Sequence, residues 1–166
     1  MFWFIHQLLL GLHILLAIVW VGGIFFVGWG VYPTVKKMSI SEQRRFLSSL
    51  MQWTHWLFTA AGIGVITTGI LLGTVVGPIH NWQNVWNTTY GNIWFTALVI
   101  ALFTLAWGVF VGYKQSMKVF ADDVIWNKAE SGDMKPLNKS MTMTTVAESV
   151  EVIGFIALII CMVLLG

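Results

Sequence analysis

The chain has 166 residues, of which 57% are hydrophobic and 10% are charged, and its net charge is +2. Soluble domains carry about 25% charged residues, so this composition excludes an ordinary soluble fold and predicts an all-α integral membrane protein. The single cysteine, Cys161, excludes a disulfide framework and a cysteine metal cluster within the chain.

The first predicted helix spans about residues 4–32, inside a run (residues 1–35) that contains no Asp, Glu, Lys or Arg. Charged side chains are rare in the hydrocarbon core of a membrane, so such runs mark membrane spans. The N-terminal segment has no basic residues, and its apolar run is too long for a signal peptide. We therefore expect a retained transmembrane helix.

The second and third predicted helices come from one uncharged run, residues 46–113, which is too long for a single crossing of about 20 residues. Gly77 and Pro78, followed by polar residues up to Tyr90, interrupt this run. We therefore predict helices over about residues 52–76 and 91–113, and a fourth helix over about residues 142–165. Together they form a single transmembrane domain over residues 1–166.

The basic residues predict the orientation of this four-helix bundle. All nine Lys and Arg residues fall within residues 36–45 and 114–139. Basic loops stay in the cytoplasm, so we place loops 33–51 and 114–141 there and both termini outside, in a multi-pass protein of the cell membrane. Topology thus explains the basic residues, and no glycine-rich phosphate loop with a lysine is present. We expect no nucleic-acid partner.

Two histidines lie on one face of the first helix, because His6 and His13 are seven residues apart. Trp20 continues this stripe, and Gly23 leaves room beside it. An ionisable side chain inside a span is a functional candidate, and a histidine on such a face suits a flat aromatic cofactor or a metal ion. The alternatives are an interhelical hydrogen bond for His13 and an interfacial structural role for His6.

A third histidine, His55, lies near the cytoplasmic start of the second helix. Small residues follow on its face, including Gly62, Gly69 and Gly73. Small residues let either another helix or a porphyrin plane approach the backbone closely, and both interpretations stay open. The candidate metal ligands are His6, His13 and His55, and the candidate cofactor contacts are His13, Trp20, Gly23 and His55.

Two carboxylates belong to the fourth helix. Only residues 152–166 follow Glu151, fewer than the roughly 17 that a span requires, so we expect Glu151 within the inner half of the membrane. Glu148 is three residues earlier and shares its helix face. We predict a proton relay through Glu148 and Glu151, with His55 at a similar depth as a partner. A protonated or hydrogen-bonded structural pair is the alternative.

Short motifs in the first two helices resemble a known group of membrane proteins. The first helix reads Leu12-His13-Ile14, then Trp20 and Gly22-Gly23, and the second contains Thr67-Thr68-Gly69 after Arg44-Arg45-Phe46. Over about the first 75 residues this pattern resembles the CopD copper-resistance family and its relatives, the HemJ protoporphyrinogen oxidases.

The resemblance implies a helical membrane bundle that binds haem b through the first-helix histidine, which matches His13. HemJ-like oxidases also use a lysine in the third helix, and residues 91–113 contain none. The resemblance therefore implies haem binding more directly than oxidase activity, and it leaves open whether the protein is a membrane oxidoreductase. The likeness to CopD proteins implies copper uptake instead.

These observations predict a haem-b-binding membrane protein that acts in electron transfer or porphyrin redox chemistry. The alternatives are a copper transport or resistance protein, and a non-catalytic membrane subunit of a larger complex. The expected partners are the lipid bilayer and either further copies of the chain or subunits of a respiratory or transport complex.

Overall fold

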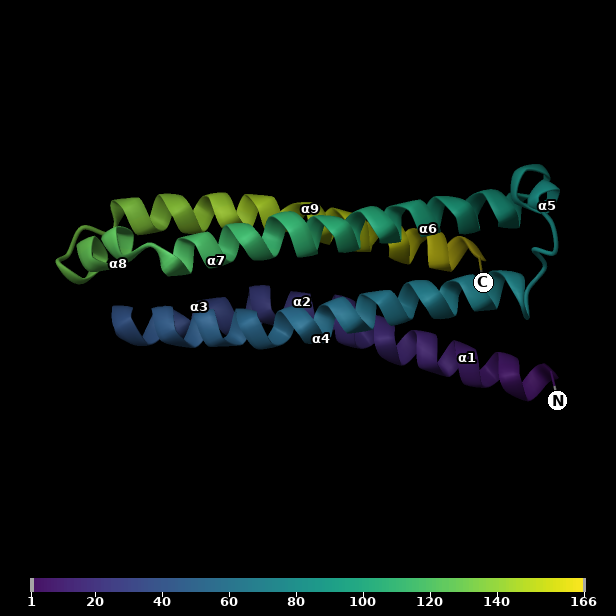
Figure 1. Ribbon diagram of the computed structural model, residues 1–166, viewed down its shortest axis with the longest axis horizontal. Coiled ribbons are helices and arrows are strands. Elements are labelled where there is room, and N and C mark those ends of the chain that lie inside the picture. Colours follow the sequence, from purple (N-terminus) through teal and green to yellow (C-terminus); the bar gives the residue numbers. More distant parts are fainter. Residues whose placement is uncertain (1, 166) are drawn as a thin grey trace.

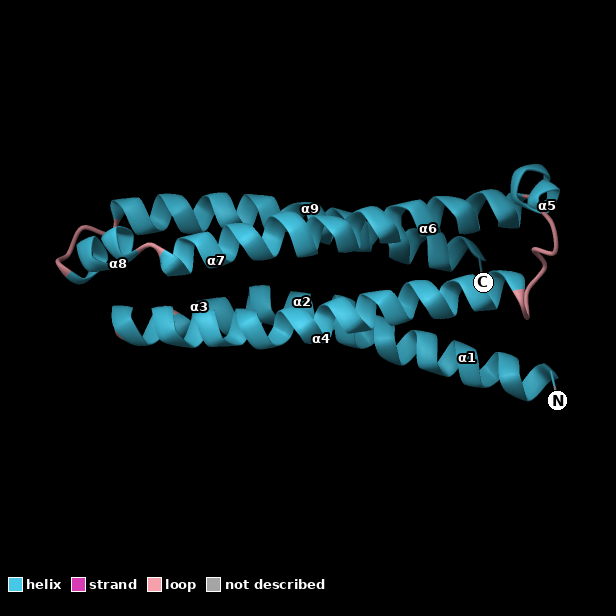
Figure 2. Ribbon diagram, in the orientation of Figure 1, coloured by secondary structure: helices cyan, strands magenta, loops and turns pink. Residues whose placement is uncertain are grey.

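The computed structural model describes residues 2–165, with side chains from Trp3 onward. Helix covers nearly all of these residues, and short loops connect the helices (Figure 2). Four stretches are long and apolar enough to cross a membrane: Trp3–Val35, Ile40–Thr74, Thr89–Ala121 and Lys135–Leu165. The all-α membrane bundle predicted from the sequence is therefore confirmed.

π-Helical turns divide two of the four spans into shorter segments. The first span consists of α1 (Phe2–Ala17), η1 (Ile18–Gly22), α2 (Gly23–Phe26), η2 (Val27–Val31) and α3 (Tyr32–Val35). The second is α4 (Ile40–Thr74), and the fourth is α9 (Lys135–Leu165). The third consists of α6 (Thr89–Trp107), η3 (Gly108–Gly112) and α7 (Tyr113–Ala121). The short helices α5 (Trp82–Asn87) and α8 (Asp123–Glu130) lie in the connections.

The spans run along the long axis of the molecule, and both chain ends lie at the same end as α5 (Figure 1). Helix α6 packs along α9, and α1 packs along α4. Toward the N-terminus α1 diverges from the other helices (Figure 1), and its apolar side chains, such as Leu8 and Leu15, are exposed. A helix that is apolar on all sides suits a lipid environment.

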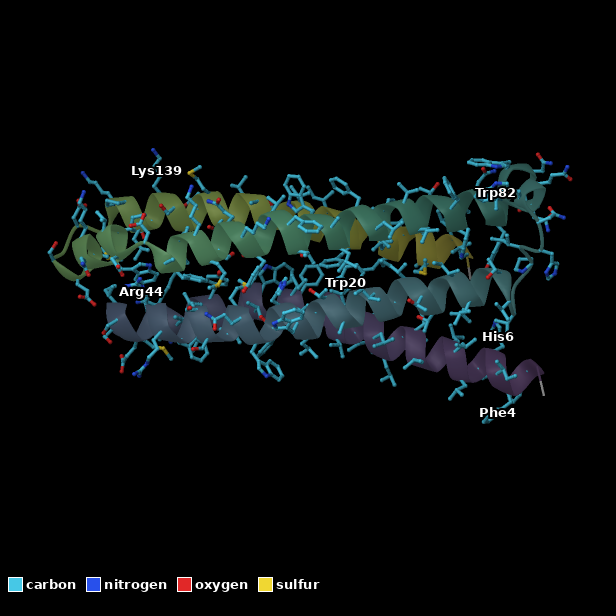
Figure 3. All side chains as sticks on the ribbon, in the orientation of Figure 1. Phe4, His6, Trp20, Arg44, Trp82 and Lys139 are labelled. Carbon is cyan, nitrogen blue, oxygen red and sulfur yellow. The ribbon has the colours of Figure 1, made fainter. Side chains whose placement is uncertain are left out.

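The Lys and Arg residues belong to the helix ends and connections around α8, which we call the basic end of the bundle. Arg44 and Lys139 mark this end in Figure 3, whereas Trp82 and His6 mark the opposite end. The opposite connection, residues 78–90, contains no Asp, Glu, Lys or Arg. This asymmetry is the basis of the predicted orientation.

The basic end is more helical than the sequence predicted. Helix α4 begins at Ile40 rather than near residue 52, α9 begins at Lys135 rather than near 142, and the third span continues to Ala121. Ser39 and Glu42 form a capping box that starts α4. A small core then holds these extensions together: Val35, Leu47, Val119, Phe120, Trp126, Ala129 and Leu137. Loops 33–51 and 114–141 are thus mostly helix.

Candidate functional site

A cavity of about 350 Å³ lies among the four spans, on the side of Trp20 that faces the basic end, and we call it the central cavity. Figure 3 shows Trp20 near the middle of the bundle, between the α1–α4 and α6–α9 pairs. Ligand sites of proteins typically occupy about 300–1,000 Å³. All four spans contribute to its lining, and its polar or aromatic side chains include Tyr32, His55, Phe58, Tyr113, Glu148 and Glu151.

The Glu151 side chain is 93% buried, with an exposed fraction of only 7%. Its carboxylate lies against the third span, where two glycines make room for it. A Cβ atom on Gly112 would lie 2.7 Å from Oε1, and a Cβ atom on Gly108 would lie 2.8 Å from Oε2. Real Cβ contacts are longer than this, so both positions require glycine as long as the carboxylate stays where it is.

Glu148 and Glu151 differ in their hydrogen bonding. The Ser116 hydroxyl donates to Oε1 of Glu148 across 2.9 Å. Glu151 has no such donor among the side chains that the structure describes. Glu151 lines the cavity, and a carboxylate that has lost most of its hydration is costly, so a proton or a positive charge from outside the described chain would stabilise Glu151.

Three aromatic side chains from other spans line the same cavity as this carboxyl pair. The His55 ring stacks on the Tyr113 ring, with centroids 3.8 Å apart and an angle of 17° between the planes. Tyr32 also lines the cavity, and its buried hydroxyl has no hydrogen-bond partner within residues 2–165. The structure therefore places His55 at the same cavity as Glu148 and Glu151, the grouping that the sequence suggested.

No Lys or Arg is among the residues that line the cavity. In the described part of the chain the one salt bridge joins Arg44 to Asp123 across 2.7 Å, at the basic end. Glu148 and Glu151 therefore have no counter-ion among the described residues. Buried charges in proteins are normally paired, which makes these two carboxyls the exception in this bundle.

The cavity opens on the side of the bundle. Its exposed lining residues are Gly28 and Trp29 on η2 and Thr145 and Ser149 on α9, so the mouth lies between these two segments. All three π-helical turns of the described chain contribute to the lining, with Trp20 from η1, Trp29 from η2 and Gly112 from η3. π-Turns inside α-helices are frequent at functional sites.

His13 lies elsewhere, at the contact between α1 and α4. Its Nδ1 atom is 2.8 Å from the Thr68 hydroxyl oxygen, and that hydroxyl is also 2.7 Å from the Gly64 carbonyl oxygen. Because the Gly64 carbonyl can only accept, we assign the Thr68 proton to that contact and the Nδ1–H to His13, which then donates to Thr68. The lone pair of the neutral imidazole is then on Nε2.

The stripe that contains His13 packs into glycines of α4. Side chains of His13, Leu16 and Trp20 lie over Gly69, Gly64 and Gly62, respectively. Trp20 is only 2% exposed and meets Phe155 edge-on with ring centroids 5.2 Å apart. Gly23 lies against the Phe58 ring. Side chains therefore fill the small-residue stripe. Trp20 and Gly23 leave no open surface beside His13 on which a porphyrin could lie.

The other histidines do not join His13. Thr68, the partner of His13, follows His55 by thirteen residues on α4, which is about 20 Å along the axis. His6 is half-buried one heptad closer to the N-terminus, and His80 is exposed. Within the described residues, no three His, Cys, Asp or Glu side chains lie close enough together to hold one metal ion.

The sequence pattern did not indicate several residues of the site. Tyr32, Tyr113 and Ser116 are ordinary residues at span ends, and only the packing brings them to Glu148. The spacing of Gly108 and Gly112, one turn apart in the third span, is the signal that could have indicated a close neighbour there.

No family model, curated protein or solved structure matches the chain. The resemblance of the first two helices to CopD and HemJ proteins therefore stays a prediction.

Proposed function

We propose that this protein takes up and releases protons at the carboxyl pair Glu148–Glu151 inside the membrane. The observation that carries the proposal is a cavity that contains both carboxyls, histidine and tyrosine side chains, and no Lys or Arg. Ionisable residues inside membrane spans are costly and mark proton or ion pathways. The proton relay expected from the sequence is the function that this geometry supports best.

The chemistry of the pair favours exchange of protons over a fixed charge. Two carboxylates three residues apart on α9 repel each other when both are ionised, and a buried site disfavours both charges. Ser116 donates a hydrogen bond to Glu148, which stabilises an ionised Glu148, whereas Glu151 lacks such a donor. The natural arrangement is an ionised Glu148 beside a protonated Glu151, with His55 and Tyr32 as the neighbouring groups that can pass a proton on.

Infrared spectroscopy of the purified protein tests this proposal directly. A protonated carboxyl in an apolar site has a C=O stretching band at higher frequency than a solvated one. We expect such a band in the wild-type protein at neutral pH, its loss when the pH is raised enough to ionise Glu151, and its absence from Glu151→Gln. Glu130→Gln, which removes an exposed carboxyl at the basic end, is the matched control and should keep the band. An identical band in wild type and Glu151→Gln would refute the proposal.

Haem b binding at His13 is a second candidate, and one observation favours it. The hydrogen bond to Thr68 orients the ring and leaves the Nε2 lone pair available, and metal-bound histidines commonly donate their other N–H in this way. His13 therefore fits as an axial ligand, whereas Trp20 and Gly23 do not fit as the porphyrin wall. Haem bound at His13 would supply electron-transfer or porphyrin redox chemistry.

A visible spectrum of protein from haem-replete cells tests this candidate. We expect a Soret band that His13→Ala diminishes strongly and that His80→Ala leaves intact. Thr68→Val should weaken haem binding about 10–100-fold, because it removes the partner that orients the ring. A colourless protein would refute haem binding and leave copper transport, or a subunit role in a respiratory or transport complex, as the alternatives for this face.

A further inference from the structure

The central cavity has a composition that goes beyond what proton exchange requires. A proton needs only a carboxyl and a path of polar groups, yet here aromatic rings from three spans line the same cavity as the carboxyls: Trp20, Trp29, Phe58 and Tyr113. The faces of aromatic rings attract organic cations, and the attraction increases where water is excluded. The walls are therefore suited to a ligand with both a positive charge and an apolar body.

The carboxyl of Glu151 supplies the negative charge that such a site requires. Glu151 is 93% buried, lines the cavity, and has neither a counter-ion nor a hydrogen-bond donor in the described chain. Hard metal ions such as Ca²⁺ need about six to eight oxygen ligands, and the lining does not provide such a cage. The described residues also hold no group of three metal-ligating side chains. An organic cation needs only the carboxyl and the rings.

The mouth of the cavity indicates how such a ligand would arrive. It lies between η2 and α9, where Trp29 is 79% exposed, and it opens sideways from the bundle rather than at its end. In a membrane this side faces lipid. A small amphipathic cation that has partitioned into the bilayer would reach the cavity directly.

We propose that the central cavity binds an amphipathic organic monocation, with its apolar body among the aromatic rings and its charge beside Glu151. The inference rests on the proposed proton site and names its ligand. Because the carboxyl cannot hold a proton and pair with the cation at once, the cation and the proton compete. The other titratable groups around Glu151 are Glu148 on its own helix, Tyr32 on α3, His55 on α4 and Tyr113 on α7.

Binding of radiolabelled benzyltrimethylammonium to the full-length protein in detergent tests the inference. We expect binding by the wild type, tighter at higher pH, and at least about ten-fold weaker binding by Glu151→Gln. Glu151→Asp keeps the charge and should restore most of the affinity. Glu130→Gln should bind as the wild type does. Neopentylbenzene, the uncharged carbon analogue of the probe, should not displace it at equal concentration.

Two results would overturn the inference: equal affinity of wild type and Glu151→Gln for the cation, or equal competition by the neutral analogue. A near-ultraviolet circular dichroism spectrum of Glu151→Gln that matches the wild type establishes that the aromatic packing is intact. If the spectrum of Glu151→Gln differs from the wild type, the affinity of Glu151→Asp for the cation tests the inference instead. The proton proposal is judged separately, by the infrared band. A Glu151-dependent band without cation binding refutes the cation alone, and Glu151-dependent cation binding without the band refutes the proton exchange alone.

Discussion

The contact between His13 and Thr68 yields a quantitative prediction about how the first span is held to the second. Across the helix contact, the Thr68 hydroxyl lies 2.8 Å from Nδ1 of His13, and the Val65 backbone is a second polar neighbour of this ring. Thr68→Val has nearly the same shape but cannot accept this hydrogen bond. The change should therefore remove the side-chain hydrogen bond between the two spans and should destabilise the fold.

The size of the effect follows from measurements on interhelical hydrogen bonds in membranes. Their coupling energies average about 0.6 kcal/mol and reach about 1.7 kcal/mol, and we expect a value in the upper half because Thr68 is 5% exposed. Thr67→Val is a matched control. Thr67 makes the same type of bond to the carbonyl four residues earlier, at 2.8 Å, but it is exposed and has no partner on α1.

A double-mutant cycle isolates this hydrogen bond from the other consequences of substitution. Thr68→Val, His13→Leu and the double variant are unfolded with SDS in mixed micelles, and the helical signal is followed by circular dichroism. The hydrogen bond requires a coupling energy of about 1 kcal/mol for Thr68 with His13 and none for Thr67 with His13. If the coupling energy of Thr68 with His13 is zero, the two side chains do not interact. The tautomer assigned to His13 then has no basis either.

Two further predictions concern the orientation of the bundle and the shape of the cavity. A membrane-impermeant thiol reagent added to cells should label Gln83→Cys and miss Lys128→Cys, since the basic end is expected in the cytoplasm; the reverse pattern would invert the topology. Gly112→Ala should destabilise the protein by about 1 kcal/mol, the lower end of overpacking costs, because its Cβ would displace only the end of the Glu151 side chain, and denaturation curves would measure the loss. Gly28→Ala is the control, since its Cβ would meet nothing within 4 Å, and an equal loss there would contradict the reasoning.

The sequence was sufficient to predict the number and type of the long helices. Hydrocarbon excludes Asp, Glu, Lys and Arg so strongly that their absence marks each span, and Gly77 with Pro78 marks the break between the second and third. The ends of the helices at the basic end were not predictable in this way. There, packing of residues such as Leu47 and Trp126 in one small core maintains helix where the pattern of charge alone indicates a loop.

The residues of the site were only partly predictable, and His13 shows why. Spacing placed His13 and Trp20 on one face, and the structure agrees, but spacing does not reveal what that face meets. A stripe of glycines can receive a flat cofactor or the side chains of a neighbouring helix. In this protein Gly62 receives Trp20 and Gly69 receives His13, so the space next to the histidine is already filled by its own stripe.

The carboxyl pair differs from His13 because one of its members, Glu151, has no hydrogen-bond partner or counter-ion among the described residues. His13 has Thr68 as a partner, whereas Glu151 has a glycine-lined place in the third span but no partner there. The π-turn η3 contains both of the glycines that accommodate the carboxylate, and η1 and η2 line the other side of the same cavity. Each π-turn departs from the regular ladder of helical hydrogen bonds, and an unpaired buried carboxyl is costly. Packing alone favours neither feature, so their coincidence at one cavity is better explained by a ligand or proton that binds there than by the stability of the bundle.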